Sequence, residues 1–540
     1  MNVFRVTVAL LVVAAPSAKS SRSIEPAKGI GIVRFATSCT APAQLMFNRS
    51  VALLHSFAFA QATNAFDGVL RTDPACALAW WGIALSAWGN PFGVAAKPTG
   101  QITRGLAAIK QARTTGKPTP RESRYIEAAA MLYEHADSIP QANRIAAYRD
   151  AMAGLVATAP SDTEAAIFHA LAVVFAADPR DKTYASQLAA GATLERLFIK
   201  LPDHPGLAHY IIHCYDAPPL AGRALAAATR YSHIAPDISH ALHMPSHTFT
   251  REGLWQRSIE ANVAAAAAAR REGSTAEELH SGDYRTYAYL QTGQDSAARQ
   301  IVDSLPAVAR HLDPAVVSTG ASPASGFYAL AATPARYALE RAAWAEAATL
   351  RVQPNPIPYA VAVTWFARGI GAARSDAPAV ADSAATELAR VREALSLAHE
   401  SYWTEQVDIQ RRAVMAWRDF TSGRRVQALA AMRDAADRED ATEKSAVTPG
   451  PIVPMRELLG DMLLADDQPA PALTAFVLTL RHEPNRFRSV AGAAAAANAS
   501  GDRAAARRYY AELLKLGAQA DHPGRPELVE AARILAQPPQ

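Results

Sequence analysis

A repeated spacing of small residue, bulky residue and proline constrains the fold of this chain more than any other sequence feature. An alanine is followed four positions later by an aromatic residue, and eight positions after that by proline, at Ala62, Phe66 and Pro74 and again at Ala472, Phe476 and Pro484. A small residue lets two helices approach closely, a bulky one fills the gap to the next unit, and proline ends a helix because it cannot extend the hydrogen-bond ladder. The spacing therefore predicts stacked helical hairpins.

This is the spacing of the tetratricopeptide unit, a 34-residue pair of antiparallel helices. Further positions fit it: Leu459 and Gly460 before the second motif, Ala506 and Tyr510 one period later, and Ala224 and Pro236 in the middle of the chain. The register is weak elsewhere. We expect an all-α fold, a right-handed α-solenoid of divergent tetratricopeptide helical hairpins.

The composition agrees with helices and narrows the partners. The chain has 540 residues, of which 50% are hydrophobic, 7% aromatic and 19% charged. Strands favour branched and aromatic residues, so this mixture suits packed helices better than a β-sandwich. The formal net charge of +4 is too balanced to indicate nucleic acid as the main partner.

Breaks in the helical pattern suggest how the chain is organised. We expect an N-terminal linker over residues 21–40 and a tetratricopeptide-like helical array over 41–300 that carries a histidine cluster. A linker or boundary loop is predicted at 301–326, where glycine, serine and proline gather. A C-terminal helical array should span 327–540, with its clearest repeats near 457–516.

Residues 1–20 resemble a secretory signal peptide. Arg5 precedes a short apolar run from Val6 to Ala15, and small residues follow. The run is shorter than the roughly 20 residues that cross a bilayer, and a buried N-terminal helix is the alternative. We therefore expect an exported protein, periplasmic or secreted, with no transmembrane segment after signal removal. Cys39 and Cys76 could then pair, although three cysteines leave the partners open.

Histidines make the middle of the chain distinctive. Seven of the 15 histidines lie between His204 and His247. If residues 205–215 are helical, His209 and His213 are four apart and share one face, and Asp216 lies just past the helix end. In the next segment His240, His243 and His247 recur on one face, although Pro245 should kink this helix or begin a new one.

A third segment carries His280, Asp283 and Tyr284. In a tetratricopeptide solenoid the first helices of successive hairpins line the concave surface side by side. We therefore expect the three segments to converge on one groove.

Three interpretations of this convergence compete. The residues could hold a divalent metal such as zinc, copper or iron, through His209, His213, His243 and His247, with Asp216 or Asp283 as a further ligand or a hydrogen-bond acceptor. A histidine could act as a general base, although no nucleophile or oxyanion site is recognisable. Or histidine and tyrosine could simply hydrogen-bond between helices. The structural interpretation is the preferred one.

Several segments also resemble a known family. The stretches HPGLAHYIIHCYD (204–216), HALHMPSHTFTREGLW (240–255) and DYRTYAYLQTG (283–293) resemble a family of exported bacterial tetratricopeptide-repeat proteins with the motifs HPGxxHYxIHxYD and HxxHMPSHxF. The likeness extends over nearly the whole mature chain. It implies an α-solenoid and supplies no catalytic residues.

The predicted function is binding of a protein, peptide or small ligand in the concave groove, without catalysis and without nucleic acid. The groove residues would be His209, His213, Asp216, His240, His243, His247, His280, Asp283 and Tyr284. The alternatives are a metal-dependent enzyme or metal-binding protein that uses the His204–His247 cluster, and an architectural subunit of an envelope complex. No metal or other cofactor is assigned with certainty from the sequence.

Overall fold

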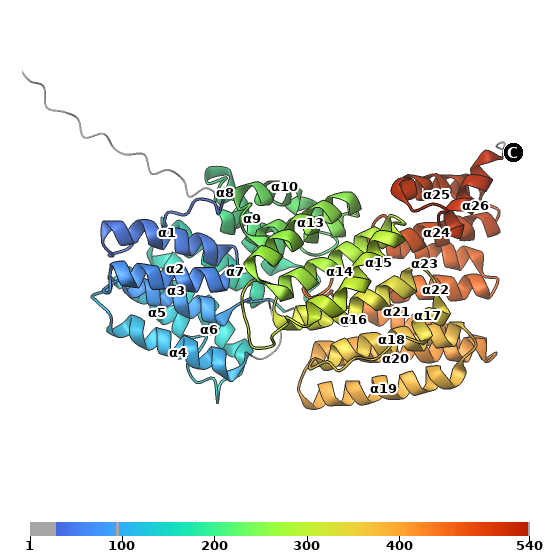
Figure 1. The fold of residues 1–540 in the computed structure, drawn as a ribbon, viewed down its shortest axis with the longest axis horizontal. Coiled ribbons are helices and arrows are strands. Elements are labelled where there is room, and N and C mark those ends of the chain that lie inside the picture. Colours follow the sequence, from blue (N-terminus) through green and yellow to red (C-terminus); the bar gives the residue numbers. More distant parts are fainter. Residues whose placement is uncertain (1–28, 93–96, 179, 538–540) are drawn as a thin grey trace, which may run out of the picture.

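The computed structural model describes residues 29–92, 97–178 and 180–537, and every regular element within these ranges is a helix. The predicted signal peptide, residues 1–20, lies outside the described residues. The molecule is elongated, with the first helices at one end and the last helices at the other (Figure 1). The predicted all-α fold is confirmed.

The first half of the chain forms a series of short helices. They are α1 (Ala41–His55), α2 (Phe59–Thr72), α3 (Ala77–Trp88), α4 (Thr99–Thr114), α5 (Pro120–Ala130), α6 (Gln141–Thr158), α7 (Thr163–Phe175), α8 (Ala185–Lys200), α9 (Pro205–Cys214), η1 (Ala221–Ala224), α10 (Leu225–Ile234), α11 (Ser239–His243) and α12 (Pro245–Arg251).

The second half has longer helices in more regular pairs. They are α13 (Trp255–Glu272), α14 (Thr275–Gln291), α15 (Asp295–Ala309), α16 (Pro323–Glu340), α17 (Trp344–Ala348), α18 (Pro358–Arg374), α19 (Pro378–Leu397), α20 (Ser401–Thr421), α21 (Arg425–Asp440), α22 (Met455–Ala465), α23 (Pro469–His482), α24 (Phe487–Ala499), α25 (Arg503–Leu516), η2 (Gly517–Gln519) and α26 (Pro526–Ala536).

Alternate helices of the second half form one layer. Helices α14, α16, α18, α20, α22 and α24 contact one another in that order, and each also packs on the helix that follows it. Helix α24 also contacts α14, so the layer bends back toward its own beginning. The backbone N–H of Phe487 donates to Gln291 Oε1 at 2.9 Å, and Trp255 Nε1 donates to the carbonyl of Asn485 at 2.7 Å. These bonds join the C-terminal hairpins to the middle of the chain.

The repeated spacing of small residue, bulky residue and proline depends on glycine in the neighbouring helix. Phe66 of α2 packs against Gly82 of α3, where an added Cβ would lie 2.2 Å from the Phe66 ring. Phe476 of α23 lies between Gly460 and Gly492, where an added Cβ would lie 2.7 and 2.5 Å from that ring. The bulky residue of one hairpin therefore occupies the space that glycine leaves in the neighbouring helix. This is the stacking that the spacing predicts.

One predicted boundary needs correction. The linker expected at 301–326 is shorter, because α15 continues to Ala309 with Pro306 inside it and α16 begins at Pro323. The pattern suggests a break here because proline and glycine favour turns, but α14 and α16 pack directly across it.

Cys39 and Cys76 form a disulfide, as the sequence allowed, and Cys214 is free and buried. None of the described helices has the length and apolarity needed to cross a bilayer.

The glycine contacts give a stability test. Gly82→Ala should lower the free energy of unfolding by about 1–3 kcal/mol, because the new methyl group overlaps the buried Phe66 ring. Gly154→Ala in α6 is the matched control, since nothing lies within 4 Å of its added Cβ. That variant should be stabilised by up to about 1 kcal/mol, because alanine favours a helix over glycine. Urea denaturation measures both, and equal effects would contradict the proposed packing.

Candidate metal centre

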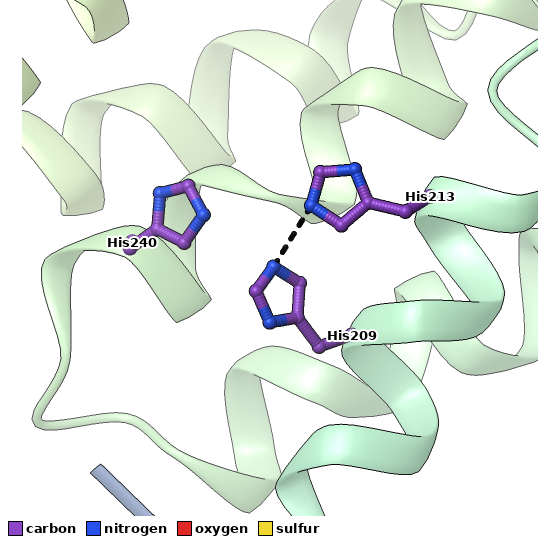
Figure 2. Close-up of side chains that lie close together, drawn as sticks. All are labelled: His209, His213 and His240. Atoms are coloured by element: carbon purple, nitrogen blue, oxygen red, sulfur yellow. Dashed lines mark hydrogen bonds between the residues drawn. The ribbon is translucent and has the colours of Figure 1, made fainter. Parts of the chain in front are cut away.

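The first group of histidines comes from two helices. Proline at the first position of α9 starts the helix after His204, and His209 and His213 then lie one turn apart on the same face. Their Nε2 atoms are 3.1 Å apart. His240 of α11 points toward the same space, with its ring centroid 5.2 Å from that of His209 (Figure 2). We call His209, His213 and His240 the first triad.

The second triad consists of His243, His247 and His280. His243 ends α11, Pro245 begins α12 as expected, and His247 lies one turn further along. The Nε2 atoms of His243 and His247 are 3.1 Å apart, and the centroids of His243 and His280 are 4.6 Å apart. His280 belongs to α14, so three helices contribute to this triad.

The two triads are neighbours. Within each triad, one nitrogen from each histidine lies within 4.8 Å of the other two. Between triads, ring centroids are 6.2 Å apart for His213 and His247 and 6.0 Å apart for His240 and His243. The three segments therefore converge as predicted. The sequence predicts four histidines as candidate metal ligands, and His240 and His280 add a third candidate ligand to each pair.

The other ring nitrogen of most of these histidines has a fixed partner. His209 Nδ1 donates to the backbone carbonyl of His55 at 2.6 Å, and His247 Nδ1 to the Asp216 carboxylate at 2.9 Å. His243 Nδ1 donates to Asn262 Oδ1 at 2.7 Å, and the Asn262 amide in turn donates to the carbonyl of Ser258. Because these acceptors hold the proton on Nδ1, each neutral ring keeps its lone pair on Nε2.

His240 follows the same pattern. Its Nδ1 lies 3.2 Å from the Glu277 carboxylate, and its buried Nε2 has no hydrogen-bond partner among the described residues. Gly320 lies against this ring, and an added Cβ there would be 2.2 Å from it. A histidine whose Nδ1 is bound to a carboxylate and whose Nε2 is free has the arrangement usual for a metal ligand.

Burial favours the neutral form of five of the six imidazoles, those of His209, His213, His243, His247 and His280. It lowers the pKa of His209, His213 and His243 well below the usual value, and that of His280 to about 3. Neutral imidazole is the form that binds metal ions.

The carboxylates beside them are ionised. Burial opposes the charge of Glu277, but neighbouring His240 outweighs it and the pKa falls. Asp216 is likewise held ionised, against burial, by Lys444 and Arg251, and its pKa lies well below the usual value. Two anionic carboxylates therefore accompany the two triads.

A segment remote in sequence completes the surroundings of Asp216. Lys444 Nζ lies 2.9 Å from Asp216 Oδ2 and comes from the connection between α21 and α22, residues 441–454. Thr448 of the same connection offers its carbonyl to the Tyr284 hydroxyl at 3.4 Å, and that hydroxyl is 3.3 Å from His247 Nε2. None of the predicted site residues comes from this segment, because no local pattern marks a proline-rich connection as part of a site.

Asp283 does not join the histidines. Its carboxylate accepts from Arg336 Nε at 2.9 Å, and both side chains are fully buried. Arg336 also donates to the carbonyls of Gly450 and Pro451. The proposed role of Asp283 as a ligand is therefore replaced by a structural one, which is to hold the 441–454 connection against α14 and α16.

A third histidine group lies beside the first triad. The Glu164 carboxylate of α7 is hydrogen-bonded to His55 Nε2 and to His204 Nε2, each at 2.9 Å. His55 Nδ1 is hydrogen-bonded to the Tyr210 hydroxyl, also at 2.9 Å. Both carboxylate oxygens are occupied by imidazole, so this group is closed and supports the fold. It also fixes the His55 carbonyl that orients His209. His55 and Glu164 lie too far from the cluster in sequence to be recognised there.

The triads open onto a cavity of about 460 Å³. His213 and His240 from the first triad, and His247 and His280 from the second, line it. Both triads can therefore be reached by one small molecule.

Comparison with known proteins identifies no family for this chain. No protein-family model matches it, and no curated protein matches its sequence. Among solved structures, a human IFIT1 dimer with m7Gppp-AAAA is 12% identical, with 82% of this chain and 90% of that chain covered at a TM-score of 0.37. The TPR domain of P58(IPK) is 13% identical, with 69% and 98% covered at 0.21. Because these TM-scores are low, the fold assignment depends on the helix packing itself.

The Asp283–Arg336 pair gives a test of structural against ligand roles. Asp283→Asn should lower the free energy of unfolding by about 3–5 kcal/mol, because the Arg336 charge stays buried without its anion. Asp303→Asn is the control. It breaks the exposed ion pair with Arg299 and should change the free energy of unfolding by less than about 1 kcal/mol. Urea denaturation measures both. A stable Asp283→Asn protein would show that the pair does not hold the connection.

Proposed function

We propose that the protein binds two metal ions, one in each histidine triad, and acts on a small molecule as a metal-dependent enzyme. One observation carries the proposal: His243 and His247 face each other with Nε2 atoms 3.1 Å apart, while both hold their protons on Nδ1. Two neutral rings in this state present lone pairs to each other. A cation between them removes the repulsion, and about 3.3 Å separates two nitrogens of a tetrahedral zinc site with 2.0–2.1 Å bonds.

The ligand type limits the metal. Both triads offer imidazole as the only type of ligand, which suits zinc, copper and iron and suits magnesium or calcium poorly. Glu277 and Asp216 bind the ligands rather than the ion and supply compensating negative charge. This arrangement orients the rings and raises their basicity.

The open side of each triad supports a catalytic role. Three protein ligands leave a position for water or substrate, whereas structural zinc sites usually have four. A metal ion in such a site acts as a Lewis acid and lowers the pKa of bound water. The Tyr284 hydroxyl, 3.3 Å from His247 Nε2, is placed to hydrogen-bond a group held there.

Binding of a protein or peptide in an open groove stays a prediction. His209, His240, His243, His247 and His280 are all buried, and the cavity has the size of a small-molecule pocket. These features favour the small ligand among the predicted occupants.

Export is also part of the proposal. The Cys39–Cys76 disulfide supports an oxidising compartment, where such bonds persist. N-terminal sequencing of the mature protein should find the first 20 or so residues removed, and an intact Met1 start would contradict a signal peptide.

Metal analysis tests the main proposal. Untagged protein, purified without chelators and then exposed to zinc or copper, should contain two ions per chain when measured by inductively coupled plasma mass spectrometry. His243→Gln should lose the ion of the second triad and His209→Gln that of the first, because each removes one of three ligands. His233→Ala, at an exposed histidine outside both triads, should keep two ions.

A further pair of variants separates loss of metal from loss of fold. Asn262→Leu removes the acceptor that orients His243 and should weaken binding by about 10–100-fold, while Asn262→Asp keeps an acceptor and should retain it. Titration with a chelator measures the affinity, and circular dichroism shows whether the variants are folded. A folded wild-type protein that binds no zinc, copper or iron would overturn the proposal.

A further inference from the structure

The cavity beside the triads has a second, cationic part. Lys97 and Arg104 line it together with the four histidines, and no aspartate or glutamate among the described residues does. The walls between are apolar, with Phe92, Met244, Val317, Phe327, Ile357 and Val447 among the lining residues. An apolar cavity with cations and no acidic side chain is complementary to an apolar molecule with a negative group.

Lys97 is the strongest feature of this part. Its Nζ donates to the carbonyl of Asn90 at 2.7 Å and lies 5.3 Å from the centre of the Trp88 ring. No carboxylate among the described residues lies within ion-pair distance, and burial lowers the pKa of Lys97 to about 8, which still leaves most of the ammonium charged at pH 7. Lys97 is half-buried, and an ammonium group that is partly removed from water is stabilised by an anion beside it. The Lys97 ammonium has three N–H donors, of which one is used by the Asn90 carbonyl, and no anionic partner among the described residues.

Three helix ends add to the positive potential. Pro98, Ser322 and Ile357, the residues just before α4, α16 and α18, all line the cavity, and the first turns of these helices contain no acidic residue. The free backbone N–H groups of a helix start favour negative charge nearby. The three helix ends therefore add to the positive potential of Lys97, and the proposed site rests on Lys97.

Asn90 connects the two parts of the cavity. While its carbonyl accepts from Lys97, its side-chain amide donates to the carbonyl of Gly320 at 2.7 Å. Gly320 is the residue that packs against His240. The ammonium and the first triad are therefore held in a fixed relation by a short chain of contacts.

We propose that this cavity binds a small apolar molecule carrying a carboxylate, with the carboxylate at Lys97 and the apolar body directed toward the histidine triads. This molecule would be the substrate of the proposed metal site. Its binding does not require the proposed metal-dependent activity, and only the chemistry after binding rests on that proposed function. A volume of about 460 Å³ accommodates a small organic acid and excludes a folded partner.

Calorimetric titration with two matched probes tests the assignment. 3-Phenylpropionate should bind at least tenfold more tightly than its uncharged amide, 3-phenylpropanamide, to metal-loaded protein. Lys97→Met should remove this preference, since methionine keeps the apolar stem without the charge, while Lys97→Arg should keep it. Lys110→Met, at an exposed lysine of α4, is the control and should leave the preference unchanged.

Repeating the titration after removal of metal by a chelator separates this proposal from the preceding one. A preference that depends on Lys97 in protein without metal supports the carboxylate site even if the triads bind no ion. Equal affinity for the two probes overturns the proposal. So does a preference that survives Lys97→Met but disappears with the metal, because the carboxylate would then bind the ion directly.

Discussion

The site depends on the protons of His209, His243 and His247 being held on Nδ1. A backbone carbonyl, an amide oxygen and a carboxylate hold them there. The carbonyl and the carboxylate have no proton to donate, and the Asn262 amide already donates to Ser258. The lone pairs at Nε2 of the three histidines must therefore point into the triads. In the second triad two such lone pairs lie 3.1 Å apart. That contact is unfavourable in a protein that only packs its histidines, and it is favourable around a cation.

Holding so many polar groups inside a helical protein requires a rigid frame. The α14–α24 layer bends back on itself, and the 441–454 connection is fixed by the buried Arg336–Asp283 pair and by Lys444 on Asp216. Breaking one member of a buried pair is costly because it leaves a charge unpaired. The same frame leaves a cavity with the histidines along one part and Lys97 in another, so that the two proposed sites share one space.

Much of this could be predicted from local patterns. The Ala62–Phe66 spacing predicts stacked hairpins because close helix approach needs a small residue opposite a bulky one, and Gly82 supplies the complementary space. His209 and His213 share a face because helical periodicity places residues four apart together. Pro245 begins a new helix, as its missing N–H suggests. The predicted linker at 301–326 is too broad, because a proline in the last turns of α15 does not end that helix.

The sequence by itself determined the helices, their hairpin stacking and which histidines share a helix face, because these depend on residues within about one turn or one repeat. Only the tertiary structure decided that His240 and His280 join the ring pairs, that Asp283 turns to Arg336, and that Asn262, Glu277 and Lys444 surround the site. Those outcomes depend on contacts between segments up to 228 residues apart. Such contacts arise from how the hairpins stack and curve, and no local spacing encodes that curvature.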